Sequence, residues 1–237
     1  AHSCGLTENG RVWCWGRGRA FGINETVNDA PQEIETNLRF LKVVAGFSVT
    51  CAIDLDQQLY CWGDNLHDII VGAAPQTLVA TPSPIAGLPN AIRDVSVGRH
   101  ACVVSVGGEV FCWGRGGDGQ LGHGSVESSV IPVKAQSDAH FVSVSVGATH
   151  TVALADTATL YGWGEQRNLP AQGLDTPTEP QTLSDGWERV SAGHRHVCAQ
   201  NAEGFVHCAG DNDFCQVAPT LAVGGVFSDL TEVSPSS

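Results

Sequence analysis

The sequence predicts an all-β fold, a β-propeller of five four-stranded blades, from three observations. A cysteine pair with a spacing of ten residues recurs four times. Trp-Gly follows each hairpin core at intervals of 46 to 51 residues, with Ala-Gly in the last copy. Short runs of valine, isoleucine, threonine and aromatic residues lie between turns, without a sustained helical period. Repeats of this length indicate propeller blades or solenoid units, and strand-like runs favour the propeller.

The cysteine pairs predict a disulfide inside each of four hairpins: Cys4 with Cys14, Cys51 with Cys61, Cys102 with Cys112, and Cys198 with Cys208. In a fifth copy Val152 and Gly162 occupy the same frame, and this paired loss is what a disulfide predicts. Opposite residues of a non-hydrogen-bonded pair have Cα atoms about 4.5 Å apart, which suits a disulfide. Metal binding is the alternative, but pairs on separate blades are too scattered for one site, and Cys-x-x-Cys is absent.

Cys215 has no partner in this frame and leaves two interpretations open. It is either a buried or capped thiol, or it forms a bridge to another chain or segment.

The third copy shows the elements of one blade in order. Strands are predicted over 92–97, 101–105, 109–113 and 130–135, with a turn at 106–108 where glycine accepts positive φ. The first strand of the other copies begins six residues before a glycine, at Phe40, Phe141 and Trp187. The repeat cores then lie near 1–16, 40–63, 92–114, 141–164 and 187–210.

The first copy lacks its own first strand, and a strand at 230–234 has the right phase to supply it. Ser236 stands in the glycine position, and His2 follows in the phase seen in the fifth copy. We therefore expect residues 1–237 to form one domain, a ring whose closing strand removes an exposed sheet edge. A piece of a longer propeller in the same phase would have the same sequence pattern.

The third copy also carries a family resemblance. It reads Val97-Gly98-Arg99-His100, then Gly108-Glu109-Val110-Phe111-Cys112-Trp113-Gly114, then Gly119-Gln120-Leu121-Gly122-His123-Gly124. These motifs resemble the regulator-of-chromosome-condensation repeat, and the resemblance extends over the whole chain. It implies a β-propeller, commonly of seven blades in that family. The other copies keep Trp-Gly or its frame but lose the Gly-Gln-Leu-Gly loop.

Cysteine usage and charge restrict the compartment and the partners. Disulfides place the protein outside the cytosol, as a secreted or surface protein. Asn24 begins a glycosylation sequon, and no run of 18 apolar residues predicts a membrane span. The net charge is −13 and the basic residues are scattered, which argues against nucleic acid. The intracellular activity that the resemblance implies, chromatin binding with nucleotide exchange, is therefore not expected.

Four histidines recur two residues before the first hairpin frame position: His2, His100, His150 and His196, with Val49 in the second copy. A ring of imidazoles along a central channel could bind a metal ion or an anion. The resemblance implies instead that this histidine forms hydrogen bonds between blades, which is the interpretation we favour.

The residues after each Trp-Gly are the candidate binding rim: Arg17, Asp64, Arg115, Glu165 and Asp211. They occupy equivalent positions with different charges, which suits recognition of one partner rather than five equal ligands. No Gly-x-Ser-x-Gly, phosphate-binding loop or calcium-loop spacing occurs, so we expect no catalytic residues, no cofactor and no metal. The sequence predicts a secreted, non-catalytic module that binds an extracellular protein. The alternatives are a lectin, and a secreted hydrolase or lyase with its site at the channel mouth.

Overall fold

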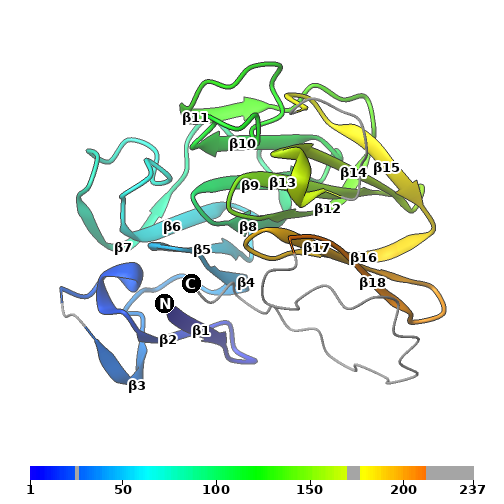
Figure 1. Cartoon of the computed structure of the whole chain (residues 1–237). Helices are drawn as coiled ribbons and strands as arrows, with labels where there is room; N and C mark the ends of the chain where they lie inside the picture. The colour runs from blue at the N-terminus through cyan, green and yellow to red at the C-terminus, as the bar shows by residue number, and fades with distance from the viewer. Residues whose placement is uncertain (25–26, 170–176, 212–237) are drawn as a thin grey trace.

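The computed structural model describes residues 1–24, 27–169 and 177–211 as five antiparallel sheets that follow one another in chain order (Figure 1). Blade 1 contains β1 (His2–Leu6), β2 (Val12–Gly16) and β3 (Asn28–Glu33). Blade 2 contains β4 (Phe40–Ala45), β5 (Val49–Asp54), β6 (Leu59–Asp64) and β7 (Leu78–Pro84). Blade 3 contains β8 (Ile92–Val97), β9 (His100–Ser105), β10 (Val110–Gly114) and β11 (Ser129–Lys134).

Blade 4 contains β12 (Phe141–Val146), β13 (His150–Ala155), β14 (Thr159–Gly164) and β15 (Gln181–Asp185). Blade 5 contains β16 (Trp187–Ala192), β17 (His196–Asn201) and β18 (Val206–Gly210). Two short 3₁₀ helices, η1 (Gly18–Phe21) and η2 (Gln166–Asn168), follow the Trp-Gly of blades 1 and 4.

The β-propeller prediction is confirmed, and the inner strands of blades 2 to 5 begin at the predicted residues. The predicted strand at 230–234 and Cys215 lie outside the described residues. Within the described residues, blade 1 has three strands and β1 is its inner edge. Closure of the ring by 230–234 stays a prediction.

The four predicted hairpin disulfides are confirmed. Each pair sits at directly opposite register positions of its hairpin, and the Cα atoms are 4.1 Å apart. Val152 and Gly162 are opposite one another in blade 4 in the same way. Closing an eleven-residue loop stabilises a protein by about 2–3 kcal/mol in the chain-entropy model. The bonded pairs are Cys4 with Cys14 in blade 1, Cys51 with Cys61 in blade 2, Cys102 with Cys112 in blade 3, and Cys198 with Cys208 in blade 5.

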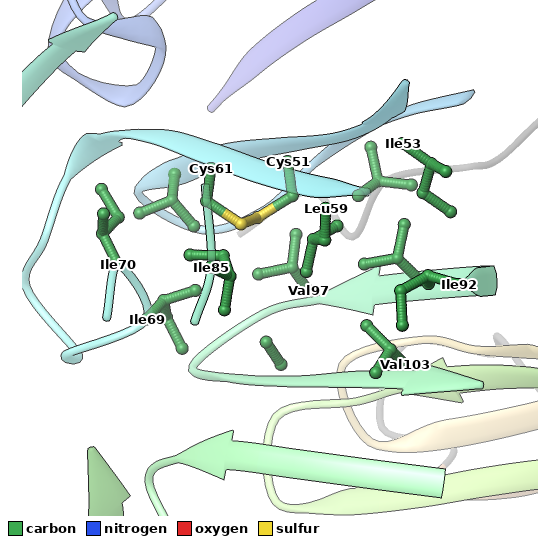
Figure 2. Packing of buried hydrophobic residues seen from close by; sticks show 14 of the residues in the cluster. Cys51, Ile53, Leu59, Cys61, Ile69, Ile70, Ile85, Ile92, Val97 and Val103 are labelled. Atoms are coloured by element: carbon green, nitrogen blue, oxygen red, sulfur yellow. A yellow bond between two sulfur atoms is a disulfide. The ribbon is translucent and has the colours of Figure 1, made fainter. Parts of the chain in front are cut away.

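The core is divided among the interfaces between consecutive blades. Between blades 2 and 3, the disulfide of Cys51 and Cys61 packs with Ile92, Val97 and Trp113 of the next blade. Figure 2 shows the sulfur atoms directed toward Leu59, Ile85 and Val97. The same arrangement of a disulfide against the next tryptophan recurs around Trp62 and Trp163. The repeat thus encodes its interfaces as well as its strands.

The glycine of Trp-Gly is required by backbone conformation and by space. Gly63 has a φ of +116°, in the region that favours glycine. A Cβ atom there would lie 2.5 Å from the carbonyl oxygen of Ala20 in blade 1. This close approach lets the loop of one blade reach the next.

Candidate functional site

The residues after each Trp-Gly lie on one face of the propeller. Their main-chain N–H groups donate to the loop that precedes β1, β5, β9, β13 and β17 in the same blade. The acceptors for Arg17, Asp64, Arg115, Glu165 and Asp211 are Ala1, Ser48, Arg99, Thr149 and Arg195, at 2.8 to 3.2 Å. We call this surface the loop face. The opposite strand ends carry the hairpin turns and form the turn face.

The five candidate rim residues differ in how accessible they are. Asp64 is only 3% exposed, and its carboxylate accepts from Arg19 at 2.9 and 3.1 Å, so Arg19 rather than Asp64 reaches solvent here. Arg115 is exposed and contacts Asp118 at 3.3 Å. Glu165 is held by Thr149, Asn168 and Arg167. The five positions thus share the same backbone hydrogen bond, but their side chains differ in burial and in partners.

Two of the four repeated histidines bond to the next blade, as expected. The Nε2 atom of His2 lies 2.8 Å from the Thr50 hydroxyl, and that of His100 lies 2.7 Å from the Thr151 hydroxyl. Thr151 in turn donates to the Gln120 carbonyl, which also accepts from the indole of Trp163. Burial lowers the pKa of His100 to about 3, with smaller effects of His150 and Arg115. This histidine is therefore a neutral structural group at pH 7.

His150 occupies the same position but lacks the hydroxyl partner. Val197 of blade 5 stands where the partners of His2 and His100 are threonines. Both ring nitrogens of His150 are buried and have no hydrogen-bond partner of good geometry among the described residues. Burial lowers its pKa to about 4. In the described part of the chain, no three His, Cys, Asp or Glu side chains come together to hold a metal ion.

A cation–aromatic cluster, the Arg99 patch, lies on the loop face. The Cζ atom of Arg99 is 5.4 Å from the centroid of the Phe47 ring, and His67 lies 5.7 Å from Phe47 between ring centroids. Phe47 is 44% exposed. After burial, the charges of Arg99 and Arg115 lower the pKa of His67, and those of Arg99 and Arg195 lower the pKa of His194. Arg99 therefore lies among residues from blades 2, 3 and 5.

The sequence alone does not single out Phe47, His67 and Arg99 as functional residues. A signal for two of them exists, because the residue after the inner-strand glycine varies in each blade: Phe47, Arg99, Ala148 and His194. This position varies on a fixed backbone frame, as the position after Trp-Gly does. Asn24, the predicted glycosylation residue, is exposed and accepts a 3.3 Å hydrogen bond from Arg19. No helix among the described residues is long and apolar enough to span a membrane.

A depression lies between blades 2 and 3 on the turn face. It is lined by Leu41, Lys42, Ile53, Gln57, Ile92, Arg93 and Val106. Its lining contains no aromatic ring and no carboxylate. A sugar would find no stacking surface there, and a hydrolytic reaction would find no acid or base pair.

Comparison with known proteins agrees with the fold. Models of the regulator of chromosome condensation (RCC1) repeat match residues 1–22, 40–68, 92–120 and 141–168, and residues 107–154. The ultraviolet-B receptor UVR8 of Arabidopsis thaliana is 31% identical over the whole chain, which spans 61% of that protein.

Two solved structures share the fold at lower identity. Prp20p of Saccharomyces cerevisiae is 19% identical with a TM-score of 0.74, over 87% of this chain and 55% of Prp20p. The ectodomain of the receptor kinase CR4 of Physcomitrella patens is 18% identical with a TM-score of 0.57, over 88% of this chain and 50% of that chain. The repeated Trp-Gly hairpins, the histidine–threonine bonds between blades and these matches together show that the chain belongs to the RCC1 repeat family.

Proposed function

We propose that this chain is a non-catalytic module that binds a protein partner outside the cytosol through its loop face. The observation that carries the proposal is the variation of side chains on a fixed frame. Each blade presents the same hydrogen-bonded loop pair, yet the positions after Trp-Gly and after the inner-strand glycine differ from blade to blade. Such an asymmetric surface suits one protein footprint.

The arginine content of the loops supports the choice of face. The loops after Trp-Gly and before the hairpins hold six of the twelve basic residues of a chain with net charge −13: Arg17, Arg19, Arg99, Arg115, Arg167 and Arg195. Arginine and aromatic side chains are enriched in protein interfaces.

The compartment and the partner class rest on separate support. Four disulfides favour an oxidising environment. Among the structural relatives, CR4 is represented by a receptor ectodomain, and Prp20p is described with binding to Gsp1p and histones. These descriptions belong to those proteins, and the fold alone does not transfer their partners.

The proposal is tested by capture from the extracellular fluid of the source organism. Immobilised wild-type protein is compared with a loop-face variant, Arg17→Glu/Arg115→Glu/Arg167→Glu, and a turn-face variant, Arg11→Glu/Arg93→Glu. We expect quantitative mass spectrometry to find a protein lost by the loop-face variant and kept by the turn-face variant. Equal capture by both variants contradicts the proposal. A glycan array covers the lectin alternative, since one glycan class bound at several sites per chain would replace the protein partner.

A further inference from the structure

The Arg99 patch combines an exposed ring with a cation that has no acidic partner among the described residues. No carboxylate of the described residues lies within ion-pair distance of Arg99, although Arg115 contacts Asp118 and Arg195 contacts Asp211. The chain has 25 acidic and 12 basic residues. An arginine that none of the described carboxylates pairs with can therefore bind a carboxylate of another molecule.

The geometry of Arg99 prepares it for a carboxylate. A guanidinium carries five N–H donors in a planar fork, which matches the two oxygens of a carboxylate. The Phe47 ring packs against one side of the Arg99 guanidinium and restrains the Arg99 side chain. Arg99 therefore loses less rotamer freedom when it binds a ligand. The exposed part of the Phe47 ring offers apolar surface next to the fork. His67 packs beside the Phe47 ring, and its lowered pKa favours the neutral imidazole.

We propose that the Arg99 patch binds an exposed Asp or Glu side chain, flanked by an apolar residue, on a loop of the protein partner. This inference rests on the proposed function and names the chemistry of its central contact. A sulfated or otherwise polyanionic glycan fits less well. It would need several free cations in a row, and it would approach a chain of net charge −13. A polyanionic glycan would also make little apolar contact with the Phe47 ring.

The probe for this site is a phage-displayed library of random twelve-residue peptides, selected on the wild-type protein. Selected peptides are synthesised with a fluorophore and titrated by fluorescence anisotropy. We expect an Asp or Glu next to an aliphatic or aromatic residue in these peptides. Their affinity should fall about tenfold for Arg99→Ala and for Phe47→Ala, as for a central interface contact.

Two further variants test whether the planar guanidinium, rather than its positive charge alone or the loss of any surface arginine, determines the affinity. Arg99→Lys keeps the charge but loses the planar fork and the stacking, so it should recover only part of the affinity. Arg93→Ala removes an exposed arginine from the turn face and should leave the affinity within about twofold. Unchanged circular dichroism of the Arg99→Lys variant shows that the fold is retained.

Peptides without an acidic consensus, or with affinities that Arg99→Ala leaves unchanged, overturn the inference. Tighter binding of a heparin hexasaccharide than of every peptide, lost on Arg99→Ala, also overturns it in favour of an anionic glycan. Failure here is distinct from failure of the proposed function. A native partner lost by the Arg17/Arg115/Arg167 variant but kept by Arg99→Ala and Phe47→Ala would refute the patch alone.

Discussion

At three of the four described interfaces, the histidine and the next blade's threonine are either both present or both absent; the exception is His150, which faces Val197. Blades 1 and 2 have His2 with Thr50, and blades 3 and 4 have His100 with Thr151. Between blades 2 and 3 both members are replaced at once, by Val49 and Ala101. An apolar pair leaves no buried polar group without a partner, whereas loss of one member does.

Removal of one member of this pair should therefore lower the free energy of unfolding more than removal of both. We expect Thr151→Ala to lower the free energy of unfolding by about 1–3 kcal/mol, because it leaves the His100 ring unsatisfied. Adding His100→Val, which recreates the apolar pair of blades 2 and 3, should restore part of that loss. Urea denaturation of both single variants and the double variant measures the coupling. The control is Thr182→Ala on the exposed outer strand β15, and strictly additive losses would contradict the prediction.

The buried histidines should also make stability depend on pH. Burial lowers the pKa values of His2, His100 and His150 to about 4, 3 and 4, against 6.5 for the free side chain. Below pH 6.5 the unfolded chain binds protons that the folded chain does not, so acid favours unfolding; above pH 6.5 both states are neutral. Between pH 6.5 and its lowered pKa, each such histidine lowers the free energy of unfolding by about 1.4 kcal/mol for each pH unit of acidification.

The measurement is the urea midpoint at pH 7, 6 and 5, above the range in which ordinary carboxylates titrate. We expect a steady fall toward pH 5 and a shallower fall for His100→Val. A midpoint that stays constant over this range would show that these rings are protonated without cost in the folded protein.

At the scale of whole elements, the interface between blades 4 and 5 differs from the others. It has lost the disulfide, replaced by Val152 and Gly162, and also the tryptophan, replaced by Ala209. Leu183 and Leu169 fill part of this space, since a Cβ at Gly162 would lie 2.7 and 3.0 Å from their side chains. This is also the interface in which the His150 ring has no hydrogen-bond partner of good geometry within the described ranges.

We expect blade 5 to open more readily than blades 2 and 3. A buried tryptophan and a disulfide pack at each of the other described interfaces, and local opening follows low packing. Hydrogen exchange followed by mass spectrometry should show earlier deuterium uptake in β16 and β17 than in β4 and β5. The latter pair has the same strand lengths and is the internal control. Equal protection of the two strand pairs would contradict this expectation.

The repeat explains which elements were predictable. Inner strands begin six residues before a repeated glycine, and cysteines ten apart mark opposite positions of a hairpin, so periodic signals located both. The Arg19–Asp64 pair and the Arg99–Phe47 contact join different blades. Such contacts have no periodic signal, because they depend on how neighbouring blades meet. For that reason the sequence places Asp64 at the binding rim and does not predict its burial under Arg19.

For the whole molecule, the two faces have different roles in the proposed function. The turn face carries Asp56, Asp156 and Glu203 beside Arg11 and Arg93, while the loop face carries Arg99, which has no carboxylate of the described residues within ion-pair distance. An excess of acidic residues on the turn face would orient the acidic partner proposed above toward the opposite loop face. The on-rate of such a partner should be more salt-sensitive than its dissociation.

Closure of the ring is testable from the hairpin turns. We propose that residues 230–234 pair with β1 and complete blade 1, so that blade 5 adjoins blade 1. Asn9, Asp56 and Glu203 occupy the same frame at the hairpin turns of blades 1, 2 and 5, and all are exposed. In a closed ring of five blades, the distance from Asn9 to Glu203 should equal that from Asn9 to Asp56.

Pulsed electron resonance between paired nitroxide labels measures both distances in a Cys215→Ser background. We expect matching distance distributions for the two pairs in the otherwise unchanged chain. Leu230→Pro should lengthen the distance from residue 9 to residue 203, because proline removes a ladder donor and disfavours the strand. The distance from residue 9 to residue 56 should not change, since blades 1 and 2 are joined by their own interface. A longer first distance that Leu230→Pro leaves unaltered would mean that blade 5 does not meet blade 1, and that the five blades do not close on themselves.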